Sequence, residues 1–247
     1  IMNLNIDVSE YSWCYDEIDN LKMNIQYIAE VGSRDGLDAI KLAHKFNPKE
    51  TYIFEADPQL SELVESNLKK YGESLNIKFF NFALGSEDKN ISFYAVDKEK
   101  YDNQGIGSFY KVNFENRLKK DPDYKRGTVQ KEIAISQKKY ESLQLSPPDL
   151  LAIDVQGAEL EVLRGFEEQL KKIKIIILET SISDNYIGGA SFIDVHKYLR
   201  RDFNLIKNSR YPSKKSRIFQ DHLKYKLSKT KLFQNDFDLL YVNKSIN

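Results

Sequence analysis

Three carboxylates in this chain each directly follow an apolar run of the kind that forms a buried strand. The acids are Glu55, Asp154 and Glu179. In open α/β sheets ligands bind at the carboxyl ends of the strands, so we expect these side chains to share one crevice. Carboxylates placed there can accept hydrogen bonds from a ribose diol, attract an ammonium group or take a proton from a hydroxyl.

A glycine turn near the N-terminus adds the second part of a nucleoside site. The apolar run 25–31 is followed by the turn and then by an amphipathic segment, and Glu55 lies about twenty residues further on, as in a nucleoside-binding βαβ unit. Glycine lets the backbone approach a ligand because it has no Cβ. We expect cofactor contacts from Glu30, Gly32, Ser33, Arg34, Asp35 and Gly36, and from Glu55 and Ala56 at the end of the second strand.

The charges of the turn indicate which nucleoside it binds. A dinucleotide fold needs G-x-G-x-x-G, so that a pyrophosphate can lie against the helix N-terminus, but Arg34 stands in the place of the second glycine. Glu30 and Asp35 would repel a pyrophosphate and suit a ligand with an ammonium group. The electrostatics therefore favour S-adenosylmethionine over NAD. A glycine turn without a ligand is the structural alternative.

A further cofactor contact is expected after the third strand, residues 77–82. Ala83 and Leu84, followed by Gly85, are small or apolar residues between which a flat adenine ring could lie. A plain turn explains the same residues equally well.

Composition limits the classes of protein that remain. The chain has 247 residues, enough for one or two domains, and its formal net charge is zero, so non-specific nucleic-acid binding is not implied. Its one cysteine, Cys14, cannot form an intrachain disulfide, which fits a cytoplasmic protein. No apolar run approaches the length of a membrane span and no signal peptide is visible, although the start at Ile1-Met2 allows for a missing upstream segment.

The chain divides into a leader and one α/β domain. Residues 1–24 are predicted as a leader with a polar-aromatic helix over about 7–24, and residues 25–247 as the domain. Two inserts interrupt the domain. The polar insert at about 97–128 is interpreted as a substrate-facing loop, with plain solvated surface as the alternative. The basic insert at about 207–235 indicates either an anionic partner or a solvated charged face.

Together these motifs resemble the FkbM family of S-adenosylmethionine-dependent methyltransferases over roughly residues 25–243. The motifs are Glu30–Gly36, Phe54–Pro58, Ala83–Gly85, Ile153–Gly165 and Ile177–Thr180, with Tyr186, Gly188 and Ser191-Phe192 in a later segment. The resemblance implies a class I methyltransferase fold of the α/β class: a mostly parallel seven-stranded sheet, helices on both faces and an antiparallel last strand. It also implies O-methylation of a sugar, glycan or related hydroxyl acceptor.

The chain departs from the family pattern at three positions. Arg34 stands where the family usually has Asn, Ala152 where it usually has Lys, and Gln156 where it commonly has Glu. The last two positions lie beside the acid that we expect to act in the reaction.

Asp154 is the expected catalytic base, which would take the proton of the acceptor hydroxyl. In a second version Asp154 and Glu179 together hold Mg²⁺, which acidifies that hydroxyl. Two alternatives of other classes remain: a nucleotide-sugar or NAD enzyme on a similar sheet, and a nucleic-acid methyltransferase or binding module that uses the basic insert. Nucleic acid ranks lower because the insert lacks aromatic residues interleaved for base stacking.

Overall fold

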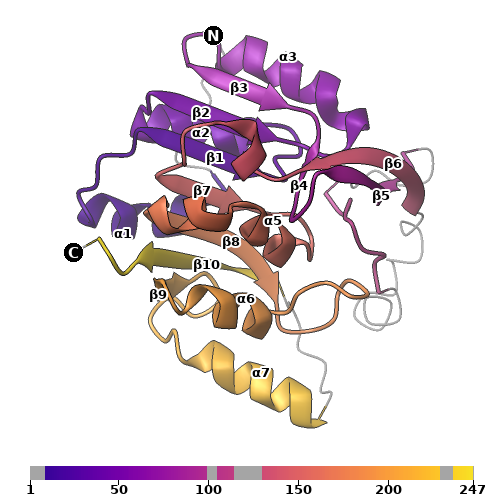
Figure 1. The fold of residues 1–247 in the computed structure, drawn as a ribbon. Helices are drawn as coiled ribbons and strands as arrows, with labels where there is room; N and C mark the ends of the chain where they lie inside the picture. The colour runs from indigo at the N-terminus through magenta and orange to yellow at the C-terminus, as the bar shows by residue number, and fades with distance from the viewer. Residues whose placement is uncertain (1–8, 99–104, 114–129, 229–235, 247) are drawn as a thin grey trace.

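The computed structural model describes residues 9–98, 105–113, 130–228 and 236–246. The described part is a layered α/β structure built on a seven-stranded sheet with strand order β3-β2-β1-β7-β8-β10-β9 (Figure 1). Its strands are β1 (Tyr27–Val31), β2 (Glu50–Phe54), β3 (Ile77–Phe80), β7 (Leu150–Ile153), β8 (Ile175–Ser181), β9 (Phe203–Asn208) and β10 (Asp236–Asn243). The predicted parallel sheet with an antiparallel last strand is confirmed, since β10 pairs antiparallel with both β8 and β9.

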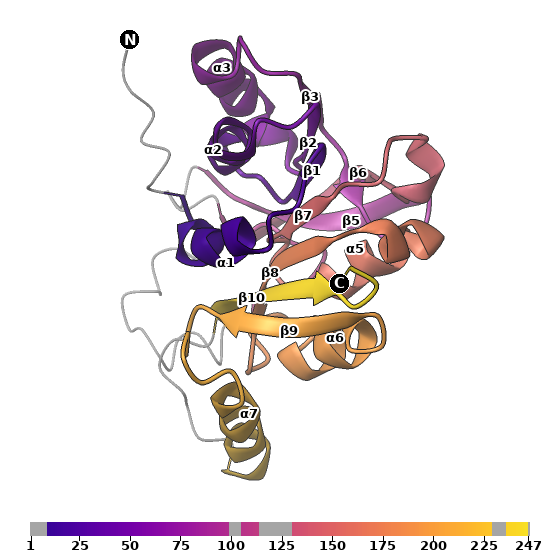
Figure 2. The same cartoon turned by 90° about the vertical axis from the view of Figure 1, so that its left-hand side faces the viewer.

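Helices cover both faces of this sheet, as Figure 2 shows. One face carries α1 (Tyr15–Asn20), α2 (Leu37–Phe46) and α3 (Ser61–Tyr71); the other carries α5 (Glu159–Gly165) and α6 (Phe192–Leu199). The central strands are therefore apolar on both sides, and all four residues of β7 are buried. One helix, α7 (Arg217–Ser228), lies beyond the β9 edge. No helix in the described ranges is both long and apolar enough to cross a bilayer.

The predicted third strand is interrupted. β3 ends at Phe80, and β4 (Ala83–Leu84) belongs to a separate three-stranded sheet with order β4-β6-β5. The other two strands of that sheet are β5 (Lys89–Val96) and β6 (Gln130–Lys138). This small sheet brings Ala83 and Leu84, both 2% exposed, beside the carboxyl edge of the main sheet.

The N-terminal helix is shorter than predicted. In place of a helix over 7–24, the chain forms a 3₁₀ turn, η1 (Ser12–Cys14), and then the six-residue α1. The helix ends early because Lys22 has a φ of +49°, a left-handed conformation that does not continue a right-handed helix. Residues 7 and 8 lie outside the described residues.

Four short 3₁₀ segments complete the described elements: η1, η2 (Pro58–Leu60), η4 (Glu141–Leu143) and η5 (Glu167–Lys172). The predicted inserts are only partly described. In the first, 105–113 are described, whereas 99–104 and 114–128 are not. In the second, α7 is described and 229–235 are not.

Candidate active site

The carboxyl ends of β1, β2 and β7 open onto a pocket of about 820 Å³, part of which is open to solvent. Gly32, Glu55 and Asp154, which follow these three strands, all line it. Nine of the expected cofactor residues line this pocket: Glu30, Gly32, Ser33, Arg34, Glu55, Ala56, Ala83, Leu84 and Asp154. Asp35 and Gly36 do not; Asp35 accepts a 3.0 Å hydrogen bond from the Leu37 backbone and shapes the start of α2.

Gly32 allows the glycine turn to pass against β7. Its φ is +85°, and a Cβ built on it would lie 1.7 Å from the carbonyl oxygen of Asp154. No residue with a side chain fits there, so the turn and the Asp154 strand end are held in contact. Arg34, two residues on, also has a positive φ of +55°, a conformation that Asn tolerates better than Arg.

Glu30 connects the turn to the N-terminal segment. Its carboxyl group accepts hydrogen bonds from the Ser33 hydroxyl, from the Ala39 backbone at 3.2 Å and from the Tyr11 hydroxyl at 3.2 Å. The side chain is 2% exposed, and burial, together with the charge of Asp38, raises the pKa of Glu30 to about 8. Glu30 therefore fixes the conformation of the turn through hydrogen bonds made from a buried position in the pocket lining.

Glu55 has both carboxylate oxygens directed by backbone groups. The Arg34 N–H donates to one at 2.7 Å and the Asp57 N–H donates to the other at 2.7 Å. Burial raises the pKa of Glu55 to about 7. The fixed carboxyl, with its remaining lone pairs, can accept two hydroxyl groups of a diol.

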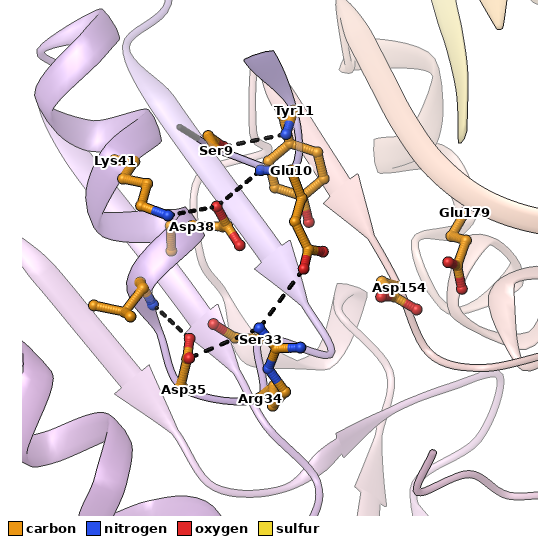
Figure 3. Close-up of polar contacts among 12 residues, drawn as sticks. Ser9, Glu10, Tyr11, Ser33, Arg34, Asp35, Asp38, Lys41, Asp154 and Glu179 are labelled. Carbon is orange, nitrogen blue, oxygen red and sulfur yellow. Dashed lines mark hydrogen bonds and ion pairs between the residues drawn. The ribbon is translucent and has the colours of Figure 1, made fainter. Parts of the chain in front are cut away.

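The pocket is strongly acidic at the end near Asp154, where Figure 3 shows Glu10, Arg34 and Asp38 close together. Arg34 is the one cation among the described lining residues, against six acids: Glu10, Glu30, Asp38, Glu55, Asp57 and Asp154. Its guanidinium lies 3.6 Å from Glu10 and 3.8 Å from Asp35. The opposite end is apolar, with Leu60, Phe82, Ala83, Phe93 and Phe109.

The N-terminal segment contributes residues that sequence reasoning missed. Tyr11 reaches Glu30, and the Glu10 backbone donates a 3.1 Å hydrogen bond to Asp38. Glu10, Tyr11 and Asp38 all line the pocket. These contacts join residues 19 to 28 positions apart, and no local pattern in the sequence marks them.

Gln156 lies at the junction with a second pocket of about 380 Å³. Its amide nitrogen donates to Asp154 at 2.6 Å and to Glu179 at 2.8 Å, and its amide oxygen accepts from the Tyr186 hydroxyl. Glu179 lines the second pocket, not the first. The two acids expected to act in catalysis therefore face different pockets and are joined by one amide.

The two carboxyl groups influence each other. Burial, followed by the Asp154 charge, raises the pKa of Glu179 well above its ordinary value. Burial also raises the pKa of Asp154, although hydrogen bonding with Glu179 and, to a lesser extent, with Gln156 lowers it. Glu159, at the start of α5, instead accepts a 2.8 Å hydrogen bond from the Gly157 backbone, and an acid in this position is favourable to the N-terminus of a helix.

The second pocket is lined mainly by polar residues. Thr180 is 4% exposed, and its hydroxyl has no hydrogen-bond partner in the described part of the chain. The lining residues are Gln156, Gly157, Glu159, Glu179, Thr180, Ser181, Ser183, Asp184, Asn185, Tyr186, Gly189, Ala190, Ser191 and Asp236. Such a surface suits a ligand with several hydroxyl groups better than a flat aromatic one.

No group of three or more His, Cys, Asp or Glu side chains that could hold a metal ion occurs within the described ranges. The Asp154–Glu179 pair also does not fit a cation as it stands, because the Gln156 amide nitrogen donates to both carboxylates from between them.

The strand order and the pocket at the strand ends define a class I methyltransferase. The profile of the methyltransferase FkbM domain matches residues 30–205, and the chain belongs to this family. The family resemblance read from the sequence is thereby confirmed. Membership makes the chain a methyltransferase with S-adenosylmethionine as methyl donor.

Two curated relatives are similar over much of the chain. Methyltransferase sdnD of Sordaria araneosa is 27% identical over 185 residues, which cover 68% of this chain and 70% of the relative. The 2-O-methyltransferase NoeI of Sinorhizobium fredii is 25% identical over 173 residues, which cover 65% of each protein. The chain thus spans slightly less than two thirds of NoeI.

Among solved structures, methyltransferase FkbM from Methylobacillus flagellatus KT is similar with a TM-score of 0.50 and 12% identity. The similarity covers 89% of this chain and 44% of that one. At this identity it supports the fold alone.

Proposed function

We propose that this chain methylates a hydroxyl oxygen of a small polyhydroxylated acceptor, such as a sugar or glycan. The observation that carries the proposal is the hydrogen-bonded group at the junction of the two pockets, where Asp154 borders one pocket, Glu179 the other and Gln156 both. This arrangement offers a carboxylate base between a cofactor and a separate acceptor.

The larger pocket fits S-adenosylmethionine from end to end. Glu55 is suited to the ribose diol, and the apolar end near Phe82 and Phe93 to the adenine ring. The acidic end suits the ammonium and sulfonium groups. When bound, the cofactor supplies a methyl group already made electrophilic by the positive sulfur.

Asp154 is the proposed base, which takes the hydroxyl proton as the oxygen forms its bond to carbon and the carbon–sulfur bond breaks. Gln156 holds the Asp154 carboxylate in place through the 2.6 Å hydrogen bond, so the carboxylate does not have to reorient during the reaction. A positioned base of this kind increases the reaction rate about 10²–10⁴-fold. The alignment of two bound reactants lowers the activation free energy by roughly 7–11 kcal/mol. Glu179, whose pKa is raised by burial and by the Asp154 charge, borders the second pocket and is placed to hydrogen-bond the acceptor.

Oxygen is favoured as the methylated atom by two observations. The second pocket is lined by carboxyl, amide and hydroxyl side chains, which match the hydroxyls of a polyol. One relative is named a 2-O-methyltransferase.

Calorimetric titration of S-adenosylmethionine and S-adenosylhomocysteine, with NAD alongside, tests the cofactor part. We expect micromolar binding of the first two and none of NAD. Glu55→Ala should weaken binding strongly, because charge-assisted hydrogen bonds contribute about 1.5–3 kcal/mol each. Glu62→Ala, on the exposed side of α3, is the matched control. An unchanged dissociation constant in Glu55→Ala would remove the ribose assignment.

The acceptor part is tested with labelled S-adenosylmethionine on panels of sugar nucleotides and glycans. Methyl transfer to a hydroxyl supports the proposal. Transfer only to RNA or DNA, with a steep loss at higher salt, would instead favour the nucleic-acid alternative.

A further inference from the structure

The outer side of α7 carries exposed apolar side chains. Leu223 is 58% exposed and Leu227 is 80% exposed. The inner side is packed, since Ile218 is fully buried and Phe219 lies against Phe192 of α6 at a ring-centroid distance of 5.0 Å. The inner side of α7 therefore packs on the domain, whereas the two leucines of the outer side stay largely exposed in the described part of the chain.

Helical geometry places the two leucines together. Residues four apart lie on the same face of an α-helix, and Leu223 and Leu227 fall opposite Ile218 and His222, which face the protein. The neighbours of the leucines on the outer side are Gln220, Lys224 and Lys226. The aromatic residues of α7, Phe219 and Tyr225, are partly buried, and Phe219 packs on Phe192, so the helix presents no fully exposed aromatic ring beside the leucines in its described part.

Cations surround the leucines. The exposed basic residues of α7 and the turn before it are Lys214, Lys215, Arg217, Lys224 and Lys226. The only acid in α7 is Asp221, which is buried and lies 2.6 Å from the Tyr211 hydroxyl and 3.6 Å from Arg210. Since the whole chain has a formal net charge of zero, the positive charge is concentrated here.

The neighbouring helix offsets only part of this charge. The carboxylate of Asp194 of α6, which accepts hydrogen bonds from Ser191 in the cap of its own helix, interacts with Lys226 but adds a single negative charge against five cations. Leu223 and Leu227, with the five cations, are called the α7 surface below.

We propose that the α7 surface docks on an anionic lipid bilayer. Leucines in the centre with lysines on both flanks are the pattern of an interfacial helix, whose apolar side chains enter the headgroup region while the cations meet acidic lipids. A nucleic acid would pair with the lysines but would leave the leucines in water, and base stacking would need aromatic side chains. The lipid surface is the occupant that uses both features.

Docking of this kind would bring the proposed acceptor pocket near the bilayer. Ser191 lines that pocket, and the next residue, Phe192, packs on Phe219 of α7. Acceptors carried on lipids would then be within reach. The docking itself does not depend on the proposed methylation and is tested separately from it.

Co-sedimentation of the protein with vesicles tests the proposal. We expect binding to vesicles of phosphatidylcholine mixed with phosphatidylglycerol, weak binding to phosphatidylcholine alone, and a decline as salt is added. Neutralising a cation, as in Lys214→Gln or Arg217→Gln, should weaken binding about fivefold each. The double variant Leu223→Ser, Leu227→Ser should weaken it about tenfold or more at unchanged charge.

The matched control is Leu63→Ser with Lys69→Gln on α3, an exposed leucine and lysine at the opposite edge of the sheet (Figure 1). These changes should leave vesicle binding unaltered, and thermal melting should show all variants folded. Absence of binding to acidic vesicles at low salt would overturn the proposal. Vesicle binding that is unchanged in the Leu223→Ser, Leu227→Ser variant would overturn it as well. So would tighter binding of single-stranded RNA than of acidic vesicles.

Discussion

The side-chain amide of Gln156 donates a 2.6 Å hydrogen bond to the carboxylate of Asp154 where the two pockets meet. The same nitrogen donates to Glu179, and the Tyr186 hydroxyl donates to the amide oxygen, which fixes the orientation of the amide. A neutral donor is therefore hydrogen-bonded to both of the carboxylates that a divalent cation would need as ligands.

Removal of metal should not affect the wild-type enzyme. Because the Gln156 amide already satisfies both carboxylates, we expect unchanged turnover in the presence of a chelator and no calorimetric signal with Mn²⁺. Gln156→Glu replaces the donor with a third carboxylate and should bind Mn²⁺ measurably. Loss of wild-type activity with chelator, restored by Mg²⁺, would show that the metal-assisted version is correct.

Asp154 and Glu179 should respond differently to neutral isosteres. Asp154→Asn removes the proposed base, and kcat should fall about 10²–10⁴-fold even at saturating S-adenosylmethionine, although the Kd of the cofactor should also rise because Asp154 lines its pocket. Glu179→Gln should have a much smaller effect on kcat, because Glu179 borders the second pocket and not the pocket that holds the methyl donor. If kcat fell further in Glu179→Gln than in Asp154→Asn, the base would be Glu179.

Arg34 should recognise the carboxylate of the cofactor, because it is the one cation among the described residues that line the pocket. Wild-type protein should bind S-adenosylmethionine about 10–100-fold more tightly than its decarboxylated analogue, the range expected for charge-assisted hydrogen bonds. Arg34→Asn should abolish this preference while easing the positive φ. Lys45→Gln, which removes a cation that is paired with Asp19 and lies outside the pocket lining, is the control. Equal binding of both ligands by the wild type would exclude the role.

Much of the fold and of the cofactor pocket could be predicted because the signals are local. Apolar runs that end in Glu55 and Asp154 mark buried parallel strands, and parallel strands bring their carboxyl ends to one edge. The contacts of Tyr11 with Glu30 could not be predicted, since they depend on how the N-terminal segment lies on the sheet. The same holds for the amide bridge of Gln156, which needs the left-handed φ of +56° at that residue.

Gly32 should tolerate no side chain. In Gly32→Ala the new Cβ would lie 1.7 Å from the Asp154 carbonyl oxygen, so the turn or the strand end must move. We expect a melting temperature lower by several degrees and a loss of S-adenosylmethionine binding. Gly36→Ala is the matched control, because it has a similar positive φ but its nearest contact is a Val64 methyl group at 3.2 Å. Equal effects of the two substitutions would mean that φ, not the contact with Asp154, explains the glycine.

The stability of the ligand-free protein should fall as the pH rises from about 5 to about 8. Burial raises the pKa of Glu30 to about 8 and the pKa of Glu55 to about 7, whereas in the unfolded chain both groups titrate near about 4.3. Burial raises the pKa of Glu159 to about 8 and that of Asp238 to about 7, so these groups add to the same trend. Between these values the native state retains protons that the unfolded state has lost, so each pH step upward favours unfolding. The lowered pKa of His222 acts in the opposite direction.

Melting temperatures measured across this range test the prediction. Glu30→Gln keeps a neutral side chain of the same shape and should flatten the decline, while Glu62→Gln on the exposed side of α3 should leave it unchanged. A melting temperature that rises steadily from pH 5 to pH 8 would mean that Glu30 is ionised in the folded protein. The Tyr11 and Ser33 hydroxyls would then be stabilising a charge, and the acidic end of the pocket would carry that charge before the cofactor binds.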